Sequence, residues 1–138
     1  MSGDSEASAV VLIDDESQHW LVWVGSVGSI EELAARFGLS DDSGIYELVD
    51  VDTAGDIVTN VLHRDLAYGS ELMPFGTASG ISDRFVTEFL ATGARFYSNG
   101  LLGIGQGSWT PATNATFDTG VIAWGSERSG CIWVEAED

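Results

Sequence analysis

The stretch GVIAWGSERSGCIWVEAED (120–138) holds two tryptophan-bearing apolar runs on either side of a short polar turn. The pattern predicts a β-hairpin that turns at Glu127 and Arg128, with Trp124 opposite Cys131. Successive side chains of a strand point to opposite faces of its sheet, and both faces of this hairpin are apolar. A hairpin with one face in water would alternate apolar and polar residues instead. The stretch therefore predicts two strands at the centre of a sheet, or a hairpin that uses one face as a contact surface.

A second hairpin is predicted near the N-terminus from two runs with strong strand propensity, AVVLID (9–14) and HWLVWVG (19–25). Trp20 and Trp23 lie three positions apart in the second run, so their side chains are expected on opposite faces of the strand. One of the two rings is therefore a candidate for an exposed position. Residues 1–7 are small and polar, and we expect a flexible arm there.

Helices are predicted where a capping residue precedes a run with apolar residues on one helical face. Ser29, Thr53 and Ser82 are the predicted caps. Gly38 is expected to end the first helix, because glycine adopts the left-handed conformation that closes a helix. The predicted helices span 29–38, 53–65 and 83–92, short strands are expected at 45–51 and 94–98, and irregular chain at 67–80 and 99–115.

These elements predict one α+β domain over residues 8–138, with a mainly antiparallel sheet and about three short helices. Apolar residues make up 44% of the 138 residues, which is enough for one core. No run approaches the ~20 apolar residues that span a bilayer. No basic leader precedes an apolar run, so we expect a cytoplasmic protein. The single cysteine, Cys131, excludes an internal disulfide and is expected to fill space in the core.

Charge is the strongest signal in the composition. The chain has 22 acidic residues against five arginines and no lysine, and its formal net charge is −17. Such a field repels nucleic acid and anionic lipid and attracts basic protein surfaces. Three explanations are open: a salt-loving host whose proteins are generally acidic, a lysine-poor host with acidic drift in composition, and a partner that is itself basic.

Two stretches have the outline of a catalytic or binding motif without its essential residues. HRDL (63–66) is not followed by the asparagine of a kinase catalytic loop. His63 and Asp65 are therefore expected to serve the end of a helix, where a histidine is favoured by the helix dipole. GIGQGS (103–108) lacks the GK[ST] of a phosphate-binding loop.

A third stretch, DVDTAGD (50–56), begins like a calcium-binding loop. Ala54 and Val61 stand at two positions where such a loop needs oxygen ligands, so we expect no calcium site. With two histidines and no lysine, the chain has few general bases other than carboxylates. We therefore expect no catalytic residue, no metal and no cofactor.

The expected function is that of a non-catalytic protein that inhibits or neutralises a basic protein which acts on nucleic acid, since such proteins have electropositive sites. Immunity proteins against nuclease or deaminase toxins, and phage inhibitors of host defence, are small acidic domains of this style. Carboxylates would pair with basic side chains of the target, and an aromatic anchor would fill its cleft. The alternatives are a salt-adapted housekeeping domain and, less favoured, an enzyme that uses carboxylates with a divalent metal. The candidate contact residues are Asp41, Asp42, Glu47, Asp50, Asp52, Asp56 and Trp109.

Overall fold

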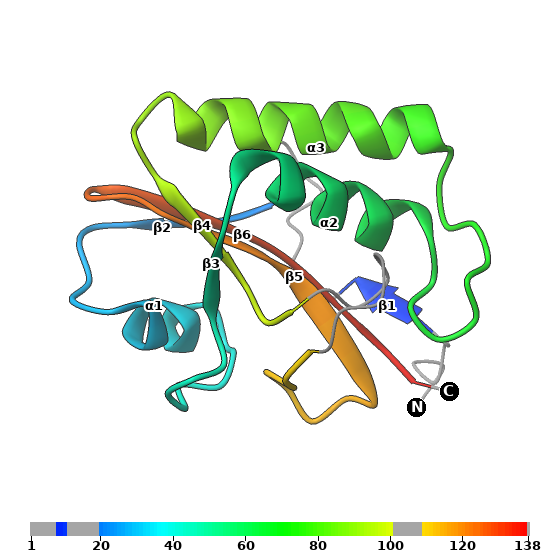
Figure 1. The fold of residues 1–138 in the computed structure, drawn as a ribbon, viewed down its shortest axis with the longest axis horizontal. Helices are drawn as coiled ribbons and strands as arrows, with labels where there is room; N and C mark the ends of the chain where they lie inside the picture. The colour runs from blue at the N-terminus through cyan, green and yellow to red at the C-terminus, as the bar shows by residue number, and fades with distance from the viewer. Residues whose placement is uncertain (1–7, 11–19, 101–108, 138) are drawn as a thin grey trace.

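The computed structural model describes residues 8–10, 20–100 and 109–137. They form three layers, with an antiparallel sheet in the middle and helices on both of its faces (Figure 1). The predicted α+β class and single domain are confirmed, with three helices among the described residues. Helices α2 (Val51–His63) and α3 (Phe75–Leu90) cover one face of the sheet, and the short helix α1 (Ile30–Arg36) lies against the other.

The sheet is built from β1 (Ser8–Val10), β2 (Leu21–Val24), β3 (Glu47–Val49), β4 (Arg95–Ser98), β5 (Phe117–Trp124) and β6 (Arg128–Ala136). Their order is β1-β6-β5-β4-β3, and β2 also pairs with β6. All of these pairings are antiparallel. The two longest strands, β5 and β6, lie in the middle, and almost every side chain along them is buried. The predicted central position of the tryptophan hairpin is therefore confirmed.

The register of the β5–β6 hairpin differs from the predicted one: each residue of β6 lies opposite a residue of β5 two positions earlier than predicted. Cys131 lies opposite Ile122 instead of Trp124, because the chain turns one residue earlier than predicted and Arg128 already belongs to β6. Two tertiary contacts hold Arg128 in the strand. Its backbone pairs with β2, and its guanidinium forms an ion pair with Glu88 of α3.

The two strands predicted near the N-terminus are present as β1 and β2, and each pairs with β6. The residues between them, 11–19, lie outside the described part of the chain, as does the predicted arm at 1–7. Trp20 and Trp23 do lie on opposite faces of the sheet. Trp20 is buried under α2 and α3, whereas Trp23 packs on the α1 side. Trp23 is half-buried, and the guanidinium carbon of Arg36 lies 4.9 Å from its ring centroid.

Apolar side chains fill both faces of the sheet. The larger cluster lies under α2 and α3 and includes Phe85 and Phe89. The smaller cluster lies under α1 and includes Leu33 and Trp133. Cys131 belongs to the smaller cluster, where burial raises the pKa of its thiol and keeps it protonated. The predicted role of this cysteine as a core residue is therefore confirmed.

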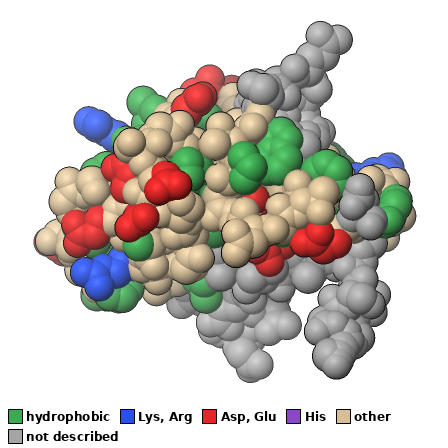
Figure 2. Space-filling model, turned by 90° about the horizontal axis from the view of Figure 1, so that it is seen from below, with side chains coloured by type: hydrophobic (Ala, Val, Ile, Leu, Met, Phe, Trp, Pro, Cys, Tyr) green, Lys and Arg blue, Asp and Glu red, His purple; other side chains and the backbone are tan. Residues whose placement is uncertain are grey.

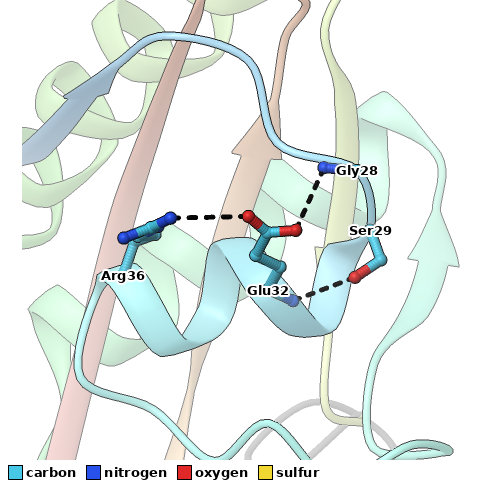
Figure 3. Close-up of polar contacts among 4 residues, drawn as sticks. All are labelled: Gly28, Ser29, Glu32 and Arg36. Atoms are coloured by element: carbon cyan, nitrogen blue, oxygen red, sulfur yellow. Dashed lines mark hydrogen bonds and ion pairs between the residues drawn. The ribbon is translucent and has the colours of Figure 1, made fainter.

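Helix α1 begins and ends as its sequence predicts (Figure 3). Ser29 is the N-cap, and its hydroxyl oxygen accepts a hydrogen bond from the backbone N–H of Glu32 at 3.1 Å. The Glu32 carboxylate accepts from the backbone N–H of Gly28 at 3.3 Å and pairs with Arg36 at 3.5 Å. Gly38 follows the helix with a φ of +87°, a conformation that glycine adopts without steric cost.

Helix α2 begins earlier than predicted. Its N-cap is Asp50 instead of Thr53, and the Asp50 carboxylate accepts a hydrogen bond from the backbone N–H of Thr53 at 2.8 Å. An aspartate at this position also interacts favourably with the positive end of the helix dipole. The predicted strand at 45–51 is correspondingly shorter, because β3 ends at Val49.

The cap of α2 makes a pH-dependent contribution to stability. The hydrogen bond from Thr53 holds the pKa of Asp50 below its ordinary value of 3.8. Such a carboxylate stabilises the fold above the ordinary value and loses this contribution as the pH falls through the lowered one. Asp50→Asn keeps a capping oxygen but cannot titrate. In thermal melts we expect it to melt a few degrees below wild type near pH 7, and we expect this difference to shrink as the pH falls below 3.8.

The matched control is Asp50→Ala, which removes the capping oxygen at every pH and should melt below the asparagine variant throughout. A difference between wild type and Asp50→Asn that is the same at both ends of the pH range would contradict this account of the cap.

Helix α3 departs most from the predicted elements. It begins at Phe75, after Pro74, so part of the region 67–80 is helical instead of irregular. The predicted cap at Ser82 is wrong, because this side chain is buried in the middle of the helix. Its hydroxyl donates a hydrogen bond to the backbone carbonyl of Gly55 in α2 at 2.9 Å. The small residues at this contact let α2 and α3 approach closely, and the packing offsets the low helix propensity of the glycines in α3.

Candidate functional site

The outer faces of α2 and α3 border a groove along the line where the two helices meet. Their inner faces carry the apolar residues that cover the sheet, so the groove opens away from the core. Its volume is about 760 Å³, which is within the range of ligand pockets. The residues that matter for its chemistry are Asp52, Asp56, Thr59, Asn60 and His63 from α2, and Phe75, Ser79, Asp83 and Val86 from α3.

Two contacts fix how α2 and α3 face each other. The ring of His63, at the end of α2, packs edge-on against Phe75 at the start of α3, with 5.5 Å between the ring centroids. Near the other end, Gly55 of α2 accepts the hydrogen bond from Ser82 of α3. The helices are therefore antiparallel. One end of the groove lies beside Gly55 and Ser82, and the other lies beside His63 and Phe75.

The end beside Gly55 is acidic. Asp52 and Asp56 reach it from α2, and Asp83 reaches it from α3. All three side chains are exposed. Neither of the two ion pairs among the described residues involves a residue of the groove. Within the described part of the chain, the carboxylates at this end therefore form no ion pair with an arginine.

The other end of the groove is apolar and open to water. Phe75 is 61% exposed, and Leu72, in the connection between the helices, is 43% exposed. Leu72 donates its backbone N–H to the carbonyl of His63 at 2.8 Å, which holds the connection against this end of α2. We call Leu72 and Phe75, which both contact His63, the apolar patch. Exposed apolar side chains that lie together are typical of a contact surface.

His63 and Asp65 order the chain next to the groove, in agreement with their predicted structural role. The Nδ1 atom of His63 donates to the carbonyl oxygen of Met73 at 2.8 Å. Asp65 is buried, and its carboxylate accepts hydrogen bonds from the backbone N–H groups of Ala67 and Tyr68 at 3.2 Å each. These bonds fold the connection back on itself and position the apolar patch.

The structure places the six acids of the predicted contact set on both sides of the sheet edge formed by β3, and all six are exposed. Only two of them line the groove. In chain order, Asp41 and Asp42 follow α1 on the other face of the sheet, Glu47 lies in β3, Asp50 caps α2, and Asp52 and Asp56 line the groove.

Acidic side chains also gather on the α1 face of the molecule. Figure 2, which views the molecule from below, shows several groups of them, whereas basic side chains lie only at the margins. A second hollow of about 530 Å³ lies between the loop after α1 and residues 111–114, and Asp42 and Glu135 border it. No exposed aromatic side chain lines this hollow, so it lacks the anchor that the α2–α3 groove has.

Trp109, the predicted aromatic anchor, is half-buried. Its ring lies beside Phe117, with 6.2 Å between the ring centroids, and its backbone forms a β-bridge with Gly100. It lines neither the groove nor the hollow on the α1 face. The glycine-rich residues before it, 101–108, lie outside the described part of the chain.

Sequence reasoning identified only Asp52 and Asp56 of the groove, and the most consequential residues that it missed are Phe75 and Asp83. Phe75 falls in a region predicted to be irregular, and Asp83 falls at the predicted start of a helix, so neither is among the predicted site residues. The apolar spacing of Ala78, Ile81 and Phe85 continues the period of the predicted helix toward the N-terminus. That spacing is the signal that could have extended α3 to Phe75.

Within residues 20–100 and 109–137, no group of three or more acidic, histidine or cysteine side chains is arranged to hold a metal ion. None of the helices described has the length and apolar character that crossing a bilayer requires. Comparisons of the chain with protein-family models, curated proteins and solved structures found no match. The fold and the groove thus define a class: a three-layer α+β domain with an acidic and partly apolar groove between two antiparallel helices.

Proposed function

We propose that this chain is a non-catalytic acidic binding protein that inhibits a basic protein acting on nucleic acid. It would do so by covering the electropositive site of that partner. An immunity protein for a nuclease or deaminase toxin has this function, and so does a phage inhibitor of a defence enzyme. The observation that carries the proposal is a large surplus of exposed carboxylates that the chain does not neutralise itself.

The surplus is visible in the pairing of charged groups. The formal net charge is −17, and the chain contains no lysine. The two ion pairs among the described residues join Arg36 to Glu32 and Arg128 to Glu88. Neither pair includes a residue of the predicted contact set. Like charges on a folded surface repel one another, and a basic partner would relieve that repulsion.

The proposed mechanism is occlusion. A site that binds nucleic acid holds Arg and Lys side chains for phosphate groups, and exposed carboxylates can take the place of those phosphates. Opposite fields would steer the two proteins together and speed their association at low salt. Inhibition of this kind needs no catalytic residue in the inhibitor.

The test begins with capture of the partner from the native host and its purification. We expect a basic protein whose action on nucleic acid stops when about one equivalent of this chain is added. In stopped-flow measurements, the association rate constant should fall by roughly tenfold or more between about 0.05 and 0.5 M NaCl, because salt screens the attraction. An association rate that is independent of salt, or full activity of the partner in the complex, would contradict the proposal.

A salt-adapted domain without a basic partner is the second candidate, and the presence of acids on both faces of the sheet favours it. Its signature lies in the isolated protein. Screening by about 1 M KCl should then raise the melting temperature well above its value in dilute buffer, because repulsion among the acids is spread over the whole surface. A melting temperature that changes little with salt would remove this candidate.

A further inference from the structure

We propose that the α2–α3 groove receives one amphipathic basic helix of the partner. An arginine or lysine of that helix would lie among Asp52, Asp56 and Asp83, and an apolar side chain two helical turns away would cover Phe75 and the rest of the apolar patch. This inference rests on the proposed function and assigns the partner's segment and its orientation along the groove.

The length of the groove sets the spacing of the two anchors. Asp56 at the acidic end and His63 at the aromatic end are separated by two turns of α2, which corresponds to roughly 10 Å along the helix axis. Phe75 packs on His63, so it lies at the same level. A partner that uses both ends at once therefore needs a basic and an apolar side chain about 10 Å apart on one face.

A helix meets this requirement better than an extended strand. Side chains seven residues apart share a face of a helix and lie about 10.5 Å apart along its axis. A strand places side chains of one face at separations of about 6.6 or 13 Å, and neither value matches the groove. The groove also runs along two helices, so a third helix can lie lengthwise against both of them.

The middle of the groove is suited to close approach of a helix backbone. Ser79, which has a small side chain, lies between Phe75 and Asp83 along α3, and Gly55, which has no side chain, lies beside the acidic end. Thr59 and Asn60 add hydroxyl and amide groups that can bond polar side chains of an incoming helix. The apolar patch supplies the surface that is released from water, and the three aspartates supply charge complementarity to a basic helix.

The experiment uses two alanine-rich peptides of about 18 residues, which is long enough for helix formation. One carries an arginine and a leucine seven positions apart. The other has the same composition with the leucine moved by two positions, which rotates it to the opposite face of the helix. By calorimetry, we expect the first peptide to bind the full-length chain at least about tenfold more tightly than the second, since only the first can fill both ends of the groove.

Matched variants of the chain locate the binding. Asp56→Asn with Asp83→Asn removes two charges from the groove, and Asp41→Asn with Asp42→Asn removes two charges from the other side of the sheet. We expect the first pair to weaken binding of the first peptide by about tenfold or more and the second pair by less than about threefold. Phe75→Ala should also weaken binding of the first peptide by about tenfold. This loss should persist in high salt, where charge contributes little to binding. Circular dichroism checks that each variant is folded.

Two results would overturn the inference: equal binding of the two peptides, or equal weakening by the two double variants, which would indicate diffuse attraction instead of a groove. Neither result touches the proposed function if the captured partner is still inhibited in a salt-dependent manner. Failure to inhibit a basic partner would instead reject the proposed function on its own test.

Discussion

Replacing Asp118 by alanine is expected to lower the free energy of unfolding by about 3–5 kcal/mol, a large part of the ~5–15 kcal/mol that holds a domain folded. Asp118 lies in β5 and is 0% exposed. Its carboxylate accepts hydrogen bonds from the backbone N–H groups of Ala112 and Thr113, at 3.1 and 3.2 Å, and from Nε1 of Trp133 at 3.1 Å. Alanine leaves these donors without their acceptor, and a buried unsatisfied donor costs about 1–3 kcal/mol.

The control for this substitution is Asp118→Asn, which keeps the shape of the side chain and one acceptor oxygen. Its amide group would point donors at other donors, so we expect an intermediate loss of about 1–3 kcal/mol. Urea denaturation followed by tryptophan fluorescence measures the free energy of unfolding of both variants. Trp133 contributes to this signal and donates a hydrogen bond to Asp118. A loss below about 1 kcal/mol for the alanine variant would mean that the buried carboxylate does not stabilise the fold.

Replacing Gly120 by alanine is expected to cost about 3 kcal/mol or more, although it adds a single methyl group. A Cβ atom at this position would lie 2.0 Å from the carbonyl oxygen of Ile132 and 2.6 Å from the Cα of Trp133. Both are backbone atoms of β6, which is paired along both of its edges. They cannot move aside without breaking hydrogen bonds of the sheet, so the strain remains in the folded state.

Gly80→Ala is the matched control for this substitution. Gly80 lies in α3, and a Cβ atom there would have no neighbour within 4 Å. Alanine is the better helix former, so we expect this variant to gain roughly 0.5–1 kcal/mol. The same added methyl group should therefore change stability in opposite directions at the two positions. A native melting temperature for Gly120→Ala would show that β5 and β6 can separate locally at little cost.

Elements with strong local signals were predictable from the sequence. Ser29 caps the N-terminus of helix α1 and Gly38 ends the helix, both as predicted from the sequence. The register of the tryptophan hairpin was not predictable in the same way. Several polar residues can serve as its turn, and the observed turn depends on the contact of Arg128 with Glu88 in another layer.

The candidate site was predictable only in part. The exposure of Asp52 and Asp56 follows from their charge and from their place on the polar face of a helix. Their association with Asp83 and Phe75 does not, because it requires the start of α3 and its antiparallel packing on α2. That start is hidden in the sequence by glycine and proline, which usually interrupt helices.

The amino-acid sequence by itself determined the α+β class, the central place of the tryptophan hairpin and the surplus of negative charge. These properties depend on residue types and on spacing between neighbours along the chain. The tertiary structure alone decided the pairing of β1 and β2 with β6, the true beginning of α3 and the existence of the groove. Those properties depend on contacts such as the hydrogen bond from Ser82 to Gly55, whose partners are 27 residues apart and meet only when the chain is folded.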